Sequence, residues 1–322
     1  MSQLETTYLG LKLKNPVIVG SSGLTSSIEK IKKIEEKGAG AIVLKSIFEE
    51  QIKYEAGNIA NGSDSPEAWD YVNHYVKQNT IQEYLELIKQ AKSEVKIPVI
   101  ASINCVSAKE WVGFAKSIEE AGADAIEINV FILPNDRNAS AEQYENIYFN
   151  LAAKLKDTIK IPFVFKLGSH FSNLVGFIQK LNVPGVVLFN RFYAPDIDID
   201  NLEFTSAEVF SSPADIRNSL RWVGIISSKI SNLDIAASTG VHDGKAVVKQ
   251  ILAGASAVQV CSTLYKNGID QIETILKEVE EWMNKHGYEN INEFKGKMSY
   301  SKIDDPLVYE RSQFMKYFSS VQ

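Results

Sequence analysis

Short apolar runs rich in Ile and Val recur along the chain, and several of them follow a helical pattern that ends in glycine. Three segments share this arrangement: EEKGAGAIVLKS at 35–46, EEAGADAIEINV at 119–130 and ILAGASAVQVCS at 251–262. Gly38, Gly122 and Gly254 stand where a helix commonly ends in a left-handed cap residue. The runs that follow lack polar alternation, which is typical of parallel strands covered on both faces. The repeat therefore predicts alternating helices and strands.

Eight apolar runs of this kind can be assigned as strands. They are Pro16–Gly20, Ala41–Lys45, Pro98–Asn104, Ala125–Val130, Pro162–Leu167, Gly185–Asn190, Asp234–Ala237 and Ala257–Cys261. Eight strands that alternate with helices predict an α/β fold of the (β/α)8 TIM-barrel type, with residues 1–322 as a single domain. A doubly wound sheet is the alternative. The sequence GSSGLTS after the first strand is not the G-x-G-x-x-G turn typical of that fold.

Four stretches lie outside the repeat. Residues 4–14 alternate enough to form a small N-terminal hairpin, which we expect to cover the bottom of the barrel. The connections at 47–79 and 192–212 are long, and the second contains YAPDIDIDNLEF, which predicts an inserted strand pair. Long connections usually carry function, and the carboxyl ends of barrel strands form the catalytic face. We therefore expect the inserted pair on that face, and residues 299–322 form a C-terminal tail.

Composition narrows the function classes. The 322 residues carry 34 Lys and Arg against 40 Asp and Glu, a net charge of −6, which argues against a nucleic-acid-binding protein. The presence of only two cysteines, Cys105 and Cys261, excludes a disulfide framework and favours the reducing cytoplasm. The polar N-terminus is unlike a signal peptide, and no apolar run approaches the roughly 18 residues of a membrane span. The four histidines lack metal-ligand spacing, so we expect no metal site.

Polar residues close the predicted strands at the end where such a barrel has its active site. In chain order they are Ser21, Ser22, Gly23, Lys45, Ser46, Asn104, Cys105, Asn129, Lys166, Asn190, Arg191, Ser238, Thr239, Gly240, Cys261, Ser262 and Thr263. Lys45 and Lys166 end otherwise apolar runs, and a lysine buried in a barrel mouth is costly unless it meets an anion or a carbonyl. We therefore expect a functional role for both lysines, although a scaffold barrel also places some polar groups at its strand ends.

The turns after the last two strands favour a phosphate group. STGVHDGK at 238–245 and CSTLYKNG at 261–268 each precede a helix, and they supply backbone N–H groups and hydroxyls. In (β/α)8 barrels the loops after strands 7 and 8 frequently bind phosphate. Ordinary turns with helix caps are the alternative interpretation.

The chain resembles the flavin-dependent dihydroorotate dehydrogenases, especially their soluble class, over about residues 4–298. LETTYLGLKLKNPVIVGSSGL is similar to the family's hairpin and first strand, and AGAIVLKS, GADAIEIN and PFVFKLG are similar to its second, fourth and fifth strands. IAASTGVHDGKAVVKQILAGASAVQVCSTLYKNG resembles the flavin-phosphate region of the family, and GYENINEFKGKM resembles its closing signature. These last two segments are the most specific parts of the resemblance.

The resemblance implies an FMN cofactor and the oxidation of dihydroorotate to orotate in pyrimidine biosynthesis, with a soluble acceptor such as fumarate. It implies FMN-binding residues at Ser22, Gly23, Lys45, Ser46, Asn104, Asn129, Lys166, Ser238, Thr239, Gly240, Cys261, Ser262 and Thr263. The two lysines would stabilise negative charge on the reduced ring. Asn129 and Asn190 would hydrogen-bond a planar, amide-bearing substrate. The family also implies a homodimer, with the 192–212 insertion as its candidate contact.

The substrate half of the family pattern is missing. The family follows its fourth-strand asparagine with N-x-S-C-P-N, whose cysteine takes a proton from the substrate, whereas residues 129–135 read NVFILPN and hold no thiol or hydroxyl. Loss of a positioned base costs roughly 10²–10⁴ in rate. NGSDSPEAWDYVN at 61–73 stands where the family has N-S-x-G-L-P-N, and Ser211-Ser212-Pro213 replaces a glycine pair. Arg191 stands where the family has serine.

Other residues are candidates for the missing roles. Cys105 is the candidate base, although a free cysteine is more often an inert buried residue, and His170 and Asp136 are alternatives. Arg191 is a candidate bidentate clamp for a substrate carboxylate. Three other functions stay open: a relative that acts on a different small substrate, a flavin- or phosphate-binding barrel without turnover, and a flavin-free phosphosugar isomerase or aldolase. The last would use Lys45 or Lys166 as a Schiff-base amine.

Overall fold

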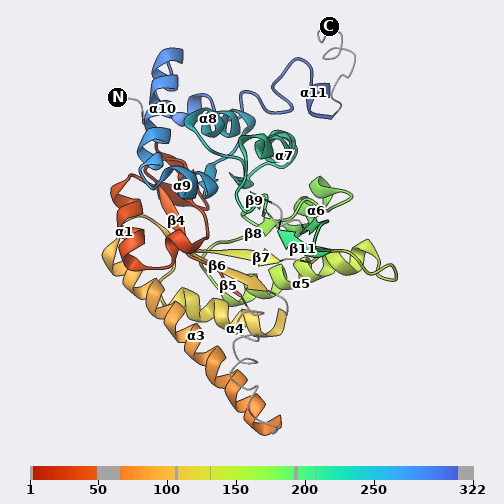
Figure 1. The fold of residues 1–322 in the computed structure, drawn as a ribbon. Helices are drawn as coiled ribbons and strands as arrows, with labels where there is room; N and C mark the ends of the chain where they lie inside the picture. Colours follow the sequence, from red (N-terminus) through yellow and green to blue (C-terminus); the bar gives the residue numbers. More distant parts are fainter. Residues whose placement is uncertain are drawn as a thin grey trace.

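The structure is a computed structural model, and it describes residues 3–48, 66–105, 108–130, 132–191, 195–206 and 208–310. Its centre is a closed parallel barrel with helices around it (Figure 1). The barrel strands are β3 (Val17–Val19), β4 (Ala41–Val43), β6 (Val99–Cys105), β7 (Ala125–Val130), β8 (Phe163–Leu167), β9 (Gly185–Leu188), β12 (Asp234–Ala237) and β13 (Ala257–Val260). Pairing of β13 with β3, and of β4 with β6, closes the ring. The predicted (β/α)8 fold and its eight strands are confirmed, and a two-residue strand β5 (Ile47–Phe48) beside β6 was not predicted.

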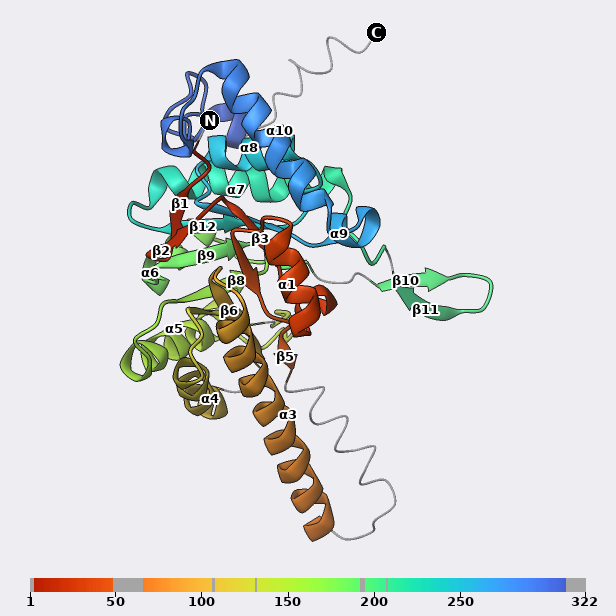
Figure 2. The same cartoon turned by 90° about the vertical axis from the view of Figure 1, so that its left-hand side faces the viewer.

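Helices follow the strands and cover the outside of the barrel. They are α1 (Ile28–Glu36), α3 (Pro66–Glu94), α4 (Ala108–Glu120), α5 (Ala141–Thr158), α6 (Leu174–Leu181), α7 (Ile216–Lys229), α8 (Gly244–Ala253), α9 (Ser262–Asn267), α10 (Gln271–His286) and α11 (Leu307–Glu310), with 3-10 turns η1 (Gly23–Thr25), η2 (Pro213–Asp215) and η3 (Ile291–Glu293). The three predicted cap glycines have φ of +94°, +96° and +120°. The N-terminal part of α3 extends well beyond the barrel (Figures 1 and 2). In the part of the chain that the structure describes, no helix has the length and apolar character that crossing a membrane requires.

The N-terminal hairpin closes the amino end of the barrel, as predicted. Its strands are β1 (Thr6–Tyr8) and β2 (Leu11–Leu13), and the side chains of Tyr8, Leu9 and Leu13 are buried. They form one cluster with side chains from all eight barrel strands: Ile18, Ala41, Val43, Ile100, Ala125, Val164, Val187, Ala236 and Ala257. Because apolar residues fill this end of the barrel, polar chemistry is confined to the carboxyl end of the strands.

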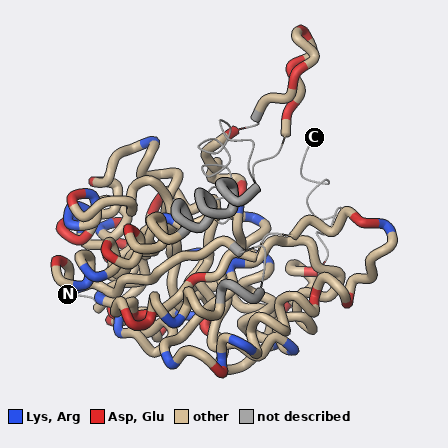
Figure 3. Tube along the Cα trace, turned by 90° about the horizontal axis from the view of Figure 1, so that it is seen from below, with Lys and Arg blue, Asp and Glu red and all other residues tan. Residues whose placement is uncertain are grey.

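The inserted strand pair is present after β9. It consists of β10 (Pro195–Asp198) and β11 (Glu203–Ser206), which are antiparallel and protrude away from the barrel (Figure 2). Four apolar side chains of this hairpin are more than half exposed: Ile197, Ile199, Leu202 and Phe204. Along the Cα trace seen from below, basic and acidic positions are intermingled (Figure 3).

The first part of the C-terminal tail packs on α7. The Tyr300 backbone N–H donates to the Gly224 carbonyl at 3.0 Å. The Tyr309 ring lies so close to Gly224 that an added Cβ would be 2.3 Å from it. The division of the chain into one domain and a tail from residue 299 stays a prediction, and residues 311–322 lie outside the described ranges.

Candidate functional site

A cavity of about 480 Å³ opens at the carboxyl ends of the barrel strands. This volume is typical of sites for small ligands and cofactors. Its lining comes from barrel strands and from the segments that follow them: Ser21, Ser22, Gly23, Lys45, Ser46, Phe48, Lys166, Asn190, Arg191, Val209, Phe210, Ser211, Ser238, Thr239, Gly240, Val241, Gln259, Cys261, Ser262 and Tyr265. Residues far apart in the sequence therefore meet in one place because parallel strands end at the same edge.

Most of the sequence-predicted site residues line this cavity. Those brought together are Ser22, Gly23, Lys45, Ser46, Lys166, Asn190, Arg191, Ser238, Thr239, Gly240, Cys261 and Ser262. Asn104, Asn129 and Thr263 lie beside it without lining it. The backbone of Cys105 ends β6, but its side chain lies outside the described residues, as do residues 61–65 of the divergent substrate segment.

The two predicted lysines differ in burial. Lys166 is 9% exposed, whereas Lys45 is exposed, which the buried-lysine interpretation did not anticipate. The reason is that β4 ends at Val43, so Lys45 lies two residues beyond the end of the strand, where its side chain is exposed. Lys45 also borders a second cavity, of about 720 Å³, between β5 and α3.

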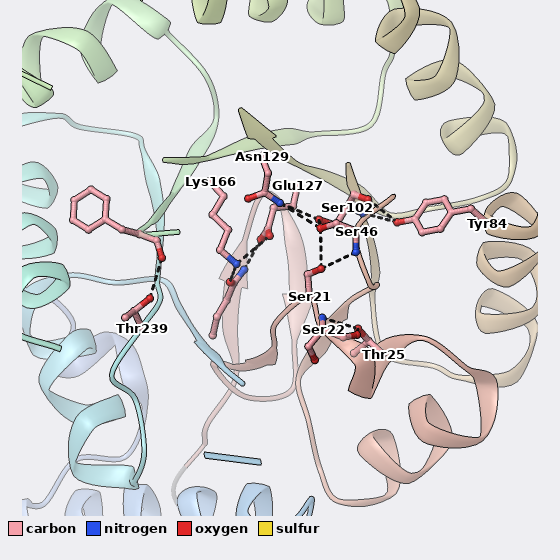
Figure 4. A network of polar contacts seen from close by, with 12 residues as sticks. Ser21, Ser22, Thr25, Ser46, Tyr84, Ser102, Glu127, Asn129, Lys166 and Thr239 are labelled. Carbon is pink, nitrogen blue, oxygen red and sulfur yellow. Dashed lines mark hydrogen bonds and ion pairs between the residues drawn. The ribbon is translucent and has the colours of Figure 1, made fainter. Parts of the chain in front are cut away.

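Lys166 is held by two residues that sequence reasoning missed. Its Nζ donates to Gln259 Oε1 at 2.9 Å and to Glu127 Oε1 at 3.3 Å, and Gln259 Nε2 donates to Glu127 Oε2 at 2.5 Å (Figure 4). Glu127 interrupts the apolar run of β7, two residues before Asn129 and on the same face. A carboxylate inside an otherwise apolar, buried strand was the sequence feature from which Glu127 could have been identified as a site residue. An ammonium in this ion pair is not the free amine that Schiff-base chemistry needs.

Hydroxyl groups form a chain on the opposite wall (Figure 4). Ser46 Oγ lies 2.9 Å from Ser21 Oγ and 2.7 Å from Ser102 Oγ. Asn129 Nδ2 donates to Ser102 Oγ at 3.3 Å, and Tyr84 of α3 bonds the Ser102 backbone. Asn129 is 5% exposed, and its Oδ1 has no hydrogen-bond partner among the described residues. A buried carbonyl oxygen without a donor is costly, so this atom is suited to accept an N–H from a ligand.

The loops after β12 and β13 form the other side of the cavity. Gly240 has φ +77°, and an added Cβ would lie 2.1 Å from the Ile216 nitrogen. Thr239 also has positive φ, +78°, and its hydroxyl donates to the Phe189 carbonyl at 3.1 Å. Strained backbone of this kind persists where the surrounding structure fixes it, often at ligand sites. Thr263 is fully buried and its hydroxyl donates to the His242 carbonyl, so its side chain is turned away from the cavity.

Cys261 presents a free thiol to the cavity. Burial raises the pKa of this thiol, while a hydrogen bond with Ser22 and the positive charge of Lys166 act in the opposite direction. A thiol with a raised pKa is protonated at neutral pH and is a poor nucleophile. Cys261 is therefore suited to packing against a ligand rather than attacking one.

Arg191 is engaged by the protein itself. Its guanidinium donates to the Glu208 carbonyl at 2.7 Å and to the Val209 carbonyl at 2.5 Å. It thereby fastens the segment after β11 to the cavity wall. A guanidinium has five N–H donors, and the described residues accept from two of them. The predicted carboxylate clamp stays a prediction.

The alternative bases lie elsewhere. His170 borders a separate pocket of about 120 Å³ with Tyr144 and Glu145. Asp136 is exposed, and its Oδ1 accepts from the Asn138 N–H at 2.9 Å. Neither lines the main cavity. Within the described ranges, no group of three His, Cys, Asp or Glu side chains is placed to hold a metal ion.

Comparison with known proteins gives a consistent picture. The family model described as dihydroorotate dehydrogenase matches residues 3–283. The "Dihydroorotate dehydrogenase B (NAD(+)), catalytic subunit" of Thermoplasma volcanium is 30% identical over 304 residues, which cover 92% of this chain and 98% of the relative. The "Putative dihydroorotate dehydrogenase A (fumarate)" of Aeropyrum pernix is 27% identical over 312 residues, which cover 91% of this chain and 97% of the relative.

Proposed function

The chain belongs to the dihydroorotate dehydrogenase family and is an oxidoreductase, and from this premise we propose that it uses FMN to oxidise or reduce a CH–CH bond of a small substrate. The observation that carries the proposal is the cavity at the strand ends, which combines a buried lysine with glycine- and hydroxyl-rich loops. FMN, when bound, supplies a two-electron donor and acceptor of hydride.

The residues present fit the phosphate end of FMN. Gly23 and Gly240 line the cavity without adding a side chain to it. A Cβ added at Gly23 would lie 3.0 Å from the hydroxyl of Tyr265, which also lines the cavity. We assign the phosphate to the loops after β12 and β13, where backbone N–H groups and hydroxyls gather. The residues in this role are Ser238, Thr239, Gly240, Cys261 and Ser262, with Thr263 contributing its backbone.

The residues also fit the ring of FMN. Lys166 is a preorganised cation that would stabilise negative charge on the reduced ring. Asn129 Oδ1 lacks a hydrogen-bond donor among the described residues, which supports a role for it as an acceptor beside the ring. The remaining proposed contacts with FMN come from Ser22, Gly23, Ser46 and Asn104. We also assign to the cofactor the exposed ammonium of Lys45 at the edge of the cavity.

We propose that the substrate is a small, planar, amide-bearing or carboxylate compound. Asn190 and Arg191 line the cavity, and the described residues use two of the five N–H donors of Arg191, so that others can bind a carboxylate. Dihydroorotate, with fumarate as the electron acceptor, is the substrate against which this proposal is compared, because the family oxidises it. A different substrate is favoured because residues 129–135 hold no proton-abstracting group.

Colour and anaerobic reduction test the proposal. Purified protein should be yellow, or become so when FMN is added and unbound FMN is removed. Dihydroorotate should bleach it anaerobically roughly 10²–10⁴ times more slowly than a base-assisted relative is bleached. Protein that stays colourless after FMN addition contradicts the flavin proposal. Rapid bleaching would instead show that another group replaces the missing base, and borohydride trapping with a sugar phosphate would support the aldolase alternative.

We also propose a homodimer formed through the β10–β11 hairpin. Ile197 and Phe204 are directly paired across its strands, and they are 59% and 83% exposed. Large exposed apolar side chains gathered on one hairpin are typical of an interaction surface.

A further inference from the structure

Lys166, Glu127 and Gln259 form a closed ring of hydrogen bonds at the floor of the cavity (Figure 4). β8 and β13 are separated in the sheet by β9 and β12, so the bond from Lys166 to Gln259 crosses the barrel interior. Glu127 is 1% exposed and Gln259 is 4% exposed. The ring is therefore a tertiary feature that is closed to solvent on all but the cavity side.

The ring fixes where each donor and acceptor points. Both oxygens of Glu127 accept a hydrogen bond, one from each partner. The Gln259 amide cannot be turned over, because its oxygen faces an ammonium and its nitrogen faces a carboxylate. The ammonium of Lys166 has three N–H donors and the ring uses two of them. Lys166 also lines the cavity, so it can direct the third donor toward a ligand.

The layer beneath the ring shows that packing alone does not require it. Two residues earlier on the same strands stand Ala125, Val164 and Ala257, which belong to the apolar cluster under the N-terminal hairpin. Apolar side chains therefore fill the barrel one layer below. A buried ion pair contributes little net stability compared with apolar residues of similar volume. The ring lies between this apolar layer and the cavity, where its charges act on a ligand.

The two charges of the ring stand at different levels of the barrel, because Glu127 is paired with Val164 in the sheet and Lys166 is paired with Asn129, nearer the carboxyl ends of the strands. The positive charge of Lys166 lowers the pKa of the Cys261 thiol, which lines the cavity, against the larger effect of burial. The negative charge of Glu127 adds to the burial that raises the pKa of Tyr8, which belongs to the hairpin beneath. The ammonium thus acts on the cavity side, whereas the carboxylate acts on the hairpin beneath and also raises the pKa of Tyr84, whose hydroxyl bonds the Ser102 backbone.

We propose that Glu127 is a positioning residue that, with Gln259, aims Lys166 at the bound flavin and attenuates its positive charge. The carboxylate orients the ammonium and partly cancels its field. Glu127 would thereby set how much more tightly the site binds reduced than oxidised FMN. This inference rests on the proposed FMN chemistry, but it requires no knowledge of the substrate.

The test compares the midpoint potential of bound FMN in the wild-type chain and in Glu127→Gln, measured at the same pH. Removal of the counter-charge should raise the ratio of affinities for two-electron-reduced over oxidised FMN at least tenfold. A two-electron couple reports this as an increase of about 30 mV. Lys166→Met should shift the potential in the opposite direction.

The exchanged variant Glu127→Gln/Gln259→Glu is the matched control. It keeps one carboxylate and one amide on Lys166 with their positions reversed, and it should restore the affinity ratio to within twofold of wild type. A ring that only stabilises the fold predicts no such recovery of the potential. If Glu127→Gln does not fold, Glu127→Asp withdraws the carboxylate and should give a smaller rise.

The outcomes separate the two proposals. Wild-type protein that binds no FMN contradicts both of them. Wild-type protein that binds FMN, with an unchanged or lower potential in Glu127→Gln or Glu127→Asp, overturns the inference about Glu127 and leaves the FMN proposal standing.

Discussion

The Oγ atom of Ser211 lies 3.0 Å from Nε2 of His242, and this contact joins the segment after β11 to the loop after β12. Two further bonds reinforce the junction. Ser211 N–H donates to Ser262 Oγ at 3.0 Å, and Lys266 Nζ donates to the Ser211 carbonyl at 3.0 Å. Because Ser211 and Ser262 both line the cavity, this junction fixes the wall proposed to bind phosphate.

His242 makes the stability of this junction depend on pH. Burial is the main cause that lowers the pKa of His242, and Lys266 lowers it further, while Ser211, Asp243 and Asp215 oppose the shift. The unfolded imidazole therefore takes up a proton at a higher pH than the folded one. The free energy of unfolding should fall as pH decreases below about 6.5, the ordinary value for histidine.

Urea unfolding between about pH 5 and 7.5 checks this expectation. The decrease should be smaller in His242→Gln, whose side chain does not titrate in this range. His170→Gln is the control, because that histidine is exposed. Equal pH dependence in the wild-type and His242→Gln proteins would contradict the assignment.

Gly240→Ala should weaken FMN binding at least tenfold and lower the melting temperature. The added Cβ would lie 2.1 Å from the Ile216 backbone nitrogen, so the loop has to move. Gly268→Ala is a matched control, since Gly268 has φ +84° with nothing within 4 Å of an added Cβ. That control should lose only about 1 kcal/mol of stability through backbone strain. Similar FMN affinity in both variants, measured by flavin fluorescence titration, would argue against a phosphate site here.

Arg191→Ala should weaken the binding of a carboxylate ligand such as orotate at least tenfold. The expectation follows from a bidentate guanidinium–carboxylate contact, and Arg191→Lys should recover only part of the affinity. The measurement is the change in flavin absorbance on titration with orotate. Arg217→Ala, on the exposed face of α7, serves as control. Unchanged affinity in Arg191→Ala would leave this residue only its role in fastening Glu208 and Val209.

Phe204→Ser should convert a homodimer into a monomer at micromolar concentration. Phe204 is 83% exposed, and loss of a central aromatic anchor typically costs an interface more than tenfold in affinity. Light scattering coupled to size exclusion reports the mass. Glu203→Gln is the control, because Glu203 lies opposite Asp198 in the hairpin and belongs to no apolar pair. This variant should remain a dimer. A wild-type protein that runs as a monomer would refute the dimer.

Local sequence determined the architecture. Glycine at 38, 122 and 254 is required by positive φ at helix ends, and Asp243 accepts the Ala246 N–H at 2.7 Å as an N-cap. Both features depend on neighbours within a few residues, so they can be read from the chain. Apolar runs without alternation identified strands buried on both faces for the same reason. The meeting of the strand-end residues in one cavity followed from the fold class alone.

The tertiary structure decided which of those residues share a function. Glu127 and Gln259 are 132 positions apart, and only the closure of the barrel brings them together on Lys166. The exposure of Lys45, and the turning of the Thr263 hydroxyl toward His242, likewise depend on where strands end and how loops pack. Sequence periodicity specifies the face on which a side chain lies, whereas its partner across the barrel is set by the register and closure of strands distant in the chain.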